Sequence, residues 1–152
     1  MNTSQATGAS ALPYAGDLGP AESWTRLKAD PTGQLIDVRT VAEWTFVGVP
    51  DLGALGREAI FCEWQRFPSA SNPAFVEEVA EALNGTGWRQ SAPLFFLCRS
   101  GGRSRSAAIA MTSAGFGPCF NVADGFEGAP DANRHRGSTG GWKAEGLPWI
   151  QS

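Results

Sequence analysis

The feature that most constrains the fold is an apolar run that ends at a cysteine and continues into a glycine-rich turn. Residues 94–97 read Leu-Phe-Phe-Leu, Cys98 follows, and residues 99–104 read Arg-Ser-Gly-Gly-Arg-Ser before an alanine-rich segment. A short apolar run, turn residues and a helical pattern in this order predict a strand, a turn and a helix. Cys98 is therefore expected at the carboxyl end of a buried strand, facing the start of a helix.

This position favours the reactive form of the Cys98 thiol. Gly101 and Gly102 allow backbone N–H groups of the turn to converge on one point. The helix that follows directs its positive end to the same point, and Arg99 and Arg103 add full charges. Each of these groups favours the thiolate, which is the nucleophile. We predict that Cys98 is the catalytic residue, and we rank an inert cysteine in a surface turn below it.

The composition narrows the classes of protein to which the chain can belong. A length of 152 residues suits one domain, and a net charge of -3 argues against a nucleic-acid partner. The cysteines at positions 62, 98 and 119 are too few, and odd in number, for a disulfide framework. His135 is the single histidine and has no neighbouring ligands, so we expect no metal site.

The N-terminal region and the hydropathy pattern predict the location of the protein. Residues 1–13 are small and polar, so we expect them to be disordered, with the folded domain spanning residues 14–152. The first residues have neither the basic start nor the apolar stretch of a signal peptide. No apolar run approaches the ~20 residues that a transmembrane helix needs. We expect a cytoplasmic protein with no membrane partner, and a reducing compartment keeps Cys98 as a thiol.

Short apolar segments alternate with helical patterns along the chain. Strands are predicted at residues 14–17, 34–39, 58–62, 93–97 and 119–122. Helices are predicted from Pro20, from Thr40 to Phe46 with Glu43 completing a capping box, from Asn72 and Pro73 to a stop at Gly85, and from the cysteine turn to Gly115. This alternation predicts an α/β fold with a central parallel sheet and helices on both faces. Ligands bind such sheets at the carboxyl ends of strands, where Cys98 is expected.

These pieces together resemble a single-domain rhodanese, of the sulfurtransferase family, from about Tyr14 to Trp149. The motifs behind the resemblance are Leu35-Ile36-Asp37-Val38-Arg39, Glu43-Trp44, the Cys98 turn, Asp124-Gly125-Phe126-Glu127-Gly128, Gly141-Trp142-Lys143 and Gly146-Leu147-Pro148-Trp149. Val47-Gly48-Val49-Pro50 departs from it, since the family often has Gly-His-Ile-Pro there. We expect the missing histidine to affect loop packing more than chemistry.

The resemblance implies a rhodanese-like fold and sulfur transfer through Cys98. The cysteine would attack the outer sulfur of thiosulfate or a similar small anionic donor and release sulfite. It would hold a persulfide until a thiol or cyanide acceptor removes the sulfur, and a protein could also be the acceptor. The residues that would bind the donor and the persulfide are Arg99, Ser100, Gly101, Gly102, Arg103 and Ser104. No metal or organic cofactor is implied.

The length of the turn separates sulfur transfer from phosphate chemistry. The related dual-specificity phosphatases and arsenate reductases usually have Cys-x5-Arg, whereas the sixth residue after Cys98 is Ser104 and Arg103 comes one position early. The shorter ring fits a single sulfur atom better than a tetrahedral phosphate, and Arg105 is expected on the first helical turn. Two other functions are alternatives: a persulfide or redox sensor without turnover, and a binding module. The retained Cys98 makes the binding module less favourable.

Several other residues have a plainer interpretation. Asp37 and Arg39 lie at a strand end and are predicted to form a structural ion pair. Cys62 and Cys119 are interpreted as buried apolar residues, with a resolving thiol at Cys62 as the less favoured alternative. His135 lies in a polar loop and is expected at the surface. Three aromatic residues are candidate walls of the substrate pocket: Trp64, Phe67 and Phe126.

Overall fold

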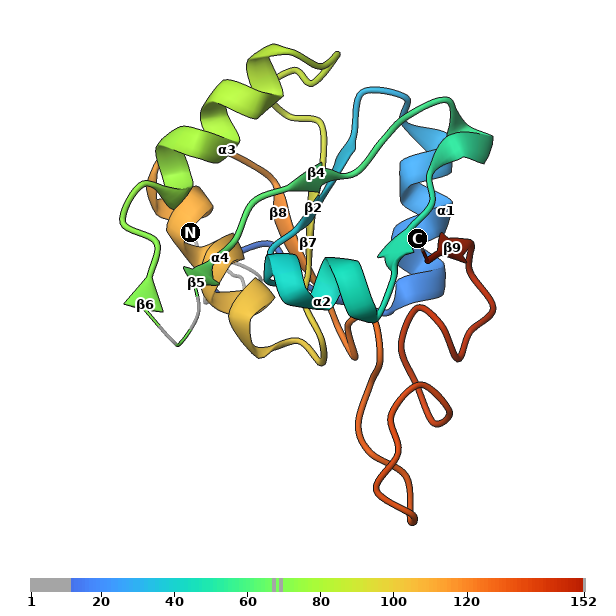
Figure 1. The fold of residues 1–152 in the computed structure, drawn as a ribbon. Coiled ribbons are helices and arrows are strands. Elements are labelled where there is room, and N and C mark those ends of the chain that lie inside the picture. Colours follow the sequence, from blue (N-terminus) through green and yellow to red (C-terminus); the bar gives the residue numbers. More distant parts are fainter. Residues whose placement is uncertain (1–11, 67, 69, 152) are drawn as a thin grey trace.

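A five-stranded parallel sheet forms the centre of the protein in a computed structural model that describes residues 12–66, 68 and 70–151 (Figure 1). The strands lie in the spatial order β1 (Gly16–Leu18), β8 (Cys119–Val122), β7 (Leu94–Leu97), β2 (Gln34–Asp37) and β4 (Ile60–Phe61). All of these pairings are parallel. The predicted α/β fold with a parallel sheet is confirmed. The disorder predicted for residues 1–13 falls mainly on residues 1–11, which lie outside the described residues.

Strand β7 lies in the middle of the sheet and ends level with β2. Its residues pair one by one with those of β2, and Asp37 is opposite Leu97. Every residue of both strands is buried, as expected for a strand with helices on both faces. Cys98 therefore leaves the sheet at the carboxyl edge, next to the end of β2.

The two faces of β7 belong to separate apolar cores. Leu94 and Phe96 pack under α3 (Phe75–Asn84) and α4 (Gly102–Ser113). Phe95 and Leu97 pack on the other face, where α1 (Pro20–Ala29) and the segment that follows β8 cover the sheet. The short helix α2 (Val41–Phe46) lies in front of the carboxyl edge of the sheet (Figure 1).

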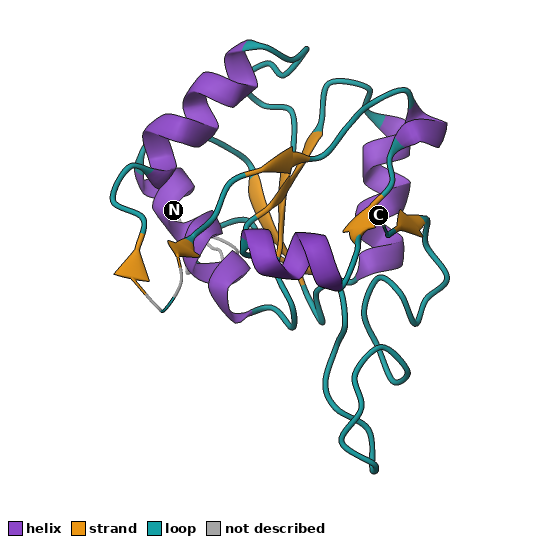
Figure 2. Ribbon diagram, in the orientation of Figure 1, coloured by secondary structure: helices purple, strands orange, loops and turns teal. Residues whose placement is uncertain are grey.

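The remaining regular elements are short. The antiparallel pairs are β3 (Val49–Pro50) with β9 (Trp149–Ile150), and β5 (Gln65–Arg66) with β6 (Ala70–Ser71), and a 3-10 helix, η2, covers Gly53–Leu55. Residues 123–148 contain no helix or strand. Phe126 and Trp142 in this segment are buried in the core, and a loop of the segment projects beyond the carboxyl edge of the sheet (Figure 2). Within the described ranges, no helix combines the length and the apolar character needed to cross a bilayer.

Some predicted boundaries were wrong by a few residues. β1 covers residues 16–18 instead of 14–17, and β4 is limited to residues 60–61. β2 ends at Asp37, whose carboxylate accepts a hydrogen bond from the Arg39 backbone, instead of at Arg39. The capping box of α2, formed by Thr40 and Glu43, is confirmed.

The start of α3 was also misplaced. The helix begins at Phe75, three residues after Asn72. The Asn72 side chain accepts a hydrogen bond from the Ala74 backbone and donates to the Glu63 carbonyl and to Glu78. Asn72 thus ties the preceding loop to the helix instead of capping it.

A buried ion pair fixes the end of β2. Arg39 Nη2 lies 2.7 Å from Asp37 Oδ2 and also donates to the Gly48 carbonyl at 2.8 Å. Both side chains are fully buried, and the Arg39 guanidinium lies 4.3 Å from the ring centroid of Phe126. One guanidinium therefore joins the end of the strand, the loop after α2 and the C-terminal segment.

Replacing Arg39 by methionine should strongly destabilise the protein. The substitution leaves the Asp37 carboxylate buried without its partner, which costs about 3–5 kcal/mol in the free energy of unfolding. Urea denaturation measures this loss. The control is Arg26→Met, because the Arg26–Glu22 pair is exposed and its removal should change stability little. Similar losses in the two variants would contradict a structural role for the buried pair.

Candidate active site

The sulfur of Cys98 lies beneath the turn that precedes α4. The Gly101 N–H donates to Cys98 Sγ at 3.1 Å, and Ser104 Oγ lies 3.2 Å from the same sulfur. Gly101 has φ +115°, a left-handed conformation that favours glycine and turns its N–H back toward the cysteine. The predicted order of strand, cysteine, turn and helix is observed. Cys98 is only 1 % exposed, so its sulfur lies at the base of the turn.

The turn after β8 holds the backbone of the cysteine turn in place. The Phe126 N–H donates to the Cys98 carbonyl at 2.8 Å, and the Glu127 and Gly128 N–H groups both donate to the Arg99 carbonyl. Gly125 has φ +63°, and a Cβ there would collide with the Cys98 carbonyl oxygen. The motif at residues 124–128 is thus a backbone clamp, a role that the sequence analysis did not assign to it.

A cleft of about 420 Å³ opens beside this turn. Its lining residues come from α2, the β4–β5 region and the cysteine turn: Thr40, Val41, Ala42, Glu43, Glu63, Gln65, Arg66, Pro68, Arg99 and Arg103. Three of these side chains are arginines and two are glutamates. The charged side chains at the cleft are therefore cationic in slight excess, on a protein whose net charge is -3.

Arg103, which was expected to meet the substrate, is bound by a carboxylate that the sequence analysis did not connect with it. Arg103 Nη1 and Nη2 donate to the two oxygens of Glu43 at 2.8 and 2.9 Å. Burial raises the pKa of Glu43, but the hydrogen bonds and charge of Arg103, with hydrogen bonds from Thr40, outweigh it and lower that pKa to about 2. The sequence predicted Glu43 only in the capping box of α2, and this local role gave no indication of its second partner, Arg103.

The other residues of the turn differ in their exposure. Arg99 and Ser100 are exposed, Arg99 at the cleft, whereas Ser104 is fully buried. Arg105 lies on the first turn of α4, as expected, with its guanidinium 6.0 Å from the ring centroid of Tyr14. Asn121, a buried residue whose amide oxygen accepts a hydrogen bond from Ser104, was not predicted from the sequence. An amide within the otherwise apolar strand at residues 119–122 was the available signal.

The other two cysteines lie in less reactive surroundings. Burial and the neighbouring Glu78 carboxylate raise the pKa of Cys62 to about 12, and Cys62 Sγ donates to Glu78 at 3.3 Å. Burial raises the pKa of Cys119 to about 11. Among the residues that the structure describes, no set of hydrogen-bond donors like that around Cys98 surrounds either thiol.

Two of the three predicted aromatic walls of the pocket, Trp64 and Phe126, do not line the cleft. Trp64 packs edge-on against Phe75 in the core, and Phe126 is fully buried beneath Arg39. Phe67 lies outside the described residues. His135 is exposed, as predicted. In the part of the chain that the structure describes, no cluster of three or more His, Cys, Asp or Glu residues could hold a metal ion.

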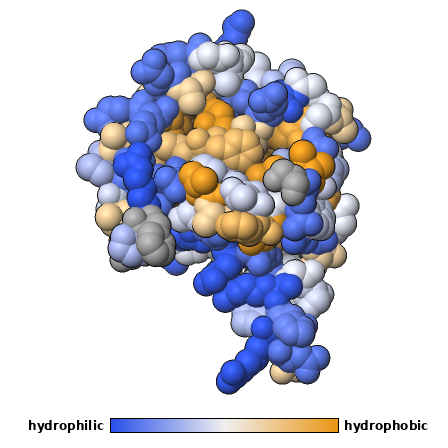
Figure 3. All heavy atoms as spheres, in the orientation of Figure 1, coloured by the Kyte–Doolittle hydropathy of each residue, from blue (hydrophilic) through white to orange (hydrophobic). Residues whose placement is uncertain are grey.

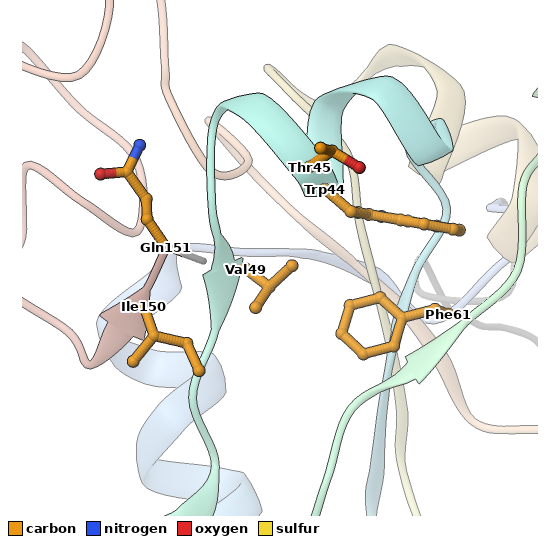
Figure 4. Close-up of a pocket in the computed structure, with 6 residues that line it drawn as sticks. All are labelled: Trp44, Thr45, Val49, Phe61, Ile150 and Gln151. Carbon is orange, nitrogen blue, oxygen red and sulfur yellow. The ribbon is translucent and has the colours of Figure 1, made fainter.

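A second, apolar groove of about 430 Å³ lies beside the C-terminal half of α2 (Figure 4). It is lined by Trp44, Thr45, Val49, Phe61, Ile150 and Gln151. The rings of Trp44 and Phe61 meet edge to face at 5.2 Å, and the space-filling view shows apolar side chains gathered on this face of the molecule (Figure 3). None of the lining side chains carries a charge or a thiol, so the cleft at the cysteine turn remains the candidate active site.

Comparison with known proteins gives matches over most of the chain. The family model described as STR4 middle domain matches residues 16–152. The crystal structure of Rv0390 from M. tuberculosis is 48% identical with a TM-score of 0.83, covering 91% of this chain and 99% of that one. An uncharacterized protein of Rickettsia conorii, RC0915, is 37% identical over 84% of this chain and 91% of its own length. The chloroplastic rhodanese-like domain-containing protein 4 of Arabidopsis thaliana is 26% identical over 85% of this chain and 24% of its own length.

Replacing Glu43 by glutamine should remove a pH-dependent part of the stability. The pKa of Glu43 falls from an ordinary 4.5 to about 2 in the folded protein, so the ionised form stabilises the fold above pH 4.5. This contribution is at most about 3 kcal/mol and is lost as the pH falls from 4.5 toward 2. Urea denaturation across that range measures the difference between the wild-type protein and Glu43→Gln.

The matched control is Glu22→Gln, which removes the exposed partner of Arg26. Its stability difference from the wild-type protein should change little with pH, since solvent screens that pair. If both substitutions gave the same pH dependence, the low pKa of Glu43 would be contradicted.

Proposed function

We propose that this chain, which belongs to the rhodanese-like sulfurtransferase family, transfers a sulfane sulfur through a persulfide on Cys98. The family membership agrees with the resemblance seen in the sequence. The activity of this chain and its donor and acceptor are the proposal. The observation that supports it best is the Gly101 N–H aimed at Cys98 Sγ from 3.1 Å, in a turn where Ser104 occupies the sixth position.

The proposed reaction has two steps that share the enzyme sulfur. In the first, the Cys98 thiolate attacks the outer sulfur of thiosulfate, the S–S bond of thiosulfate breaks, and sulfite leaves with the bonding electrons. The enzyme then holds Cys98–S–S⁻, whose charge the N–H groups of the turn stabilise. In the second step, cyanide or a thiolate attacks the outer sulfur, and the Cys98 thiolate leaves. Both steps balance without a metal or an organic cofactor.

The cleft supports an anionic donor. Arg66, Arg99 and Arg103 line it, and Arg99 is exposed at its surface. A small thiol or a thiol on another protein could reach the persulfide from the same side. A reducing cytoplasm, which keeps the resting cysteine as a thiol, is the compartment we propose.

The phosphatase alternative has less support. A phosphate-binding turn needs an arginine that is free to hold the oxyanion. Arg103, the nearest candidate to that role, gives two hydrogen bonds to Glu43. Steady production of thiocyanate from thiosulfate and cyanide would distinguish an enzyme from a sensor that holds sulfur without turnover.

Cys98 should acquire one sulfur atom from thiosulfate. Intact-protein mass spectrometry after incubation with thiosulfate should show a gain of one sulfur mass that maps to Cys98 and disappears with dithiothreitol. Cys98→Ser should show no gain and no thiocyanate formation, whereas Cys62→Ser should retain both. Turnover by Cys98→Ser equal to that of the wild-type protein would refute the assignment.

Removal of either arginine at the turn should weaken the binding of the donor. For Arg99→Ala we expect the KM for thiosulfate to rise about tenfold, the value of one hydrogen bond to a charged group, with a smaller change in kcat. Arg103→Ala should also raise the KM, because it leaves the Glu43 carboxylate without its partner and so adds negative charge to the cleft. Steady-state kinetics at low salt measures this. Arg89→Ala, an exposed arginine in the loop before β7, is the control and should keep the wild-type KM. An unchanged KM would exclude the mutated arginine from donor binding.

A further inference from the structure

A chain of polar side chains leads from Cys98 to the first strand of the sheet. Ser104 Oγ lies 3.2 Å from Cys98 Sγ and 2.6 Å from Asn121 Oδ1. Asn121 Nδ2 donates to Asp17 Oδ1 at 2.9 Å, and the Tyr14 hydroxyl donates to the same oxygen at 3.0 Å. Ser104 is fully buried and Asn121 is 4 % exposed, so neither can exchange these partners for bulk water.

The Asp17 carboxylate determines which way the Asn121 amide points. An ionised carboxylate only accepts hydrogen bonds, so the amide nitrogen must face it and the amide oxygen must face Ser104. The sheet fixes the distance between the two residues, because β1 and β8 pair with Asp17 opposite Asn121. The reversed amide would place its oxygen against the carboxylate and is disfavoured by charge.

The Ser104 hydroxyl has one hydrogen and two acceptors within reach. When Cys98 is a thiol, its S–H can donate to Ser104 Oγ while Ser104 donates to Asn121 Oδ1, and every group is satisfied. When the sulfur is an anion, it has no hydrogen to donate and gains from a hydrogen bond from Ser104 in addition to the one from Gly101. The Ser104 hydrogen must then leave Asn121, whose buried oxygen loses its donor.

We propose that Asn121, oriented by Asp17, is a positioning residue that competes with the Cys98 sulfur for the Ser104 hydrogen and so limits the resting thiolate. The inference deepens the proposed function, since it concerns the same nucleophile. Once Cys98 has taken up a sulfur atom, the charge moves to the outer sulfur and Sγ becomes neutral. The Ser104 hydrogen then returns to Asn121. The competition therefore acts on the free cysteine and not on the persulfide.

The test measures the thiolate of the resting protein, with no sulfur donor present. Ultraviolet thiolate absorbance at neutral pH, with the absorbance of Cys98→Ser subtracted, reports the thiolate-to-thiol ratio of Cys98. Cys62 and Cys119 contribute little, because their pKa values are about 12 and about 11. Asn121→Leu removes the competing acceptor and should raise the ratio roughly fivefold, the effect of one neutral hydrogen bond.

A double-mutant cycle separates the competition from a structural effect. In a Ser104→Ala background no hydrogen is shared, so Asn121→Leu should leave the ratio unchanged. Asp17→Ala is a second variant, at an exposed position, that keeps Asn121. It frees the Asn121 amide to turn, so it should raise the thiolate-to-thiol ratio of Cys98 only when Ser104 is present. Gln34→Leu, which removes another buried side-chain amide at the opposite end of the sheet, should have no effect.

The measured thiolate-to-thiol ratios either support the competition for the Ser104 hydrogen or exclude it. An increase with Asn121→Leu or Asp17→Ala that disappears in Ser104→Ala supports the competition. An unchanged ratio in both variants, or an equal increase with and without Ser104, overturns it. Because no donor is used, a protein that fails to take sulfur from thiosulfate could still pass this test, so failure of the proposed function and failure of this inference are distinguishable.

Discussion

The geometry of the site depends on the hydrogen bonds by which the turn after β8 holds the backbone of Cys98 and Arg99. The cysteine turn is short and contains two glycines, so it is not rigid by itself. The Phe126, Glu127 and Gly128 N–H groups bind the carbonyls at its start, and α4 fixes its end. With both ends held, the Gly101 N–H can point at the sulfur before any substrate arrives. Preorganised donors of this kind stabilise developing charge without reorganisation.

Two ion pairs shape the charge around this turn in different ways. Behind it, Arg39 is buried with Asp37 and joins the end of β2 to Phe126, the residue whose N–H binds the Cys98 carbonyl. In front of it, Arg103 is partly exposed and bound to Glu43 on α2. The first pair supports the clamp, and the second lowers the positive charge at the cleft. Arg99, which is exposed, is then the arginine of the turn best placed to meet an anion first.

The parts of the site that the sequence could predict are those set by neighbours along the chain. The apolar run before Cys98, the glycines after it and the capping box of Thr40 and Glu43 each depend on a few consecutive residues. The contacts that were missed join distant segments. Arg103 and Glu43 are 60 residues apart, and Asn121 and Asp17 are 104 apart.

Such long-range contacts depend on strand order and register, which no local pattern specifies. The order β1-β8-β7 places Asp17 opposite Asn121, although the two strands are the first and the last of the parallel sheet along the chain. The same limit explains Trp64 and Phe126. An aromatic side chain suits a pocket wall as well as a core, and only the tertiary packing buries Phe126 in the core and packs the partly buried Trp64 against it.

The burial of Cys98 has a chemical consequence for sulfur transfer. At 1 % exposure the resting sulfur is screened from water and from bulky oxidants, yet the transferred atom must be reached by an acceptor. In the proposed reaction a persulfide would resolve this conflict, because it would lengthen the side chain by one atom and move the anionic, reacting sulfur outward. The inner sulfur would stay beneath the turn, where Cys98 Sγ lies beside Ser104 and the Gly101 N–H. A turn one residue shorter than a phosphate loop therefore suits a substrate whose reactive part is a single atom.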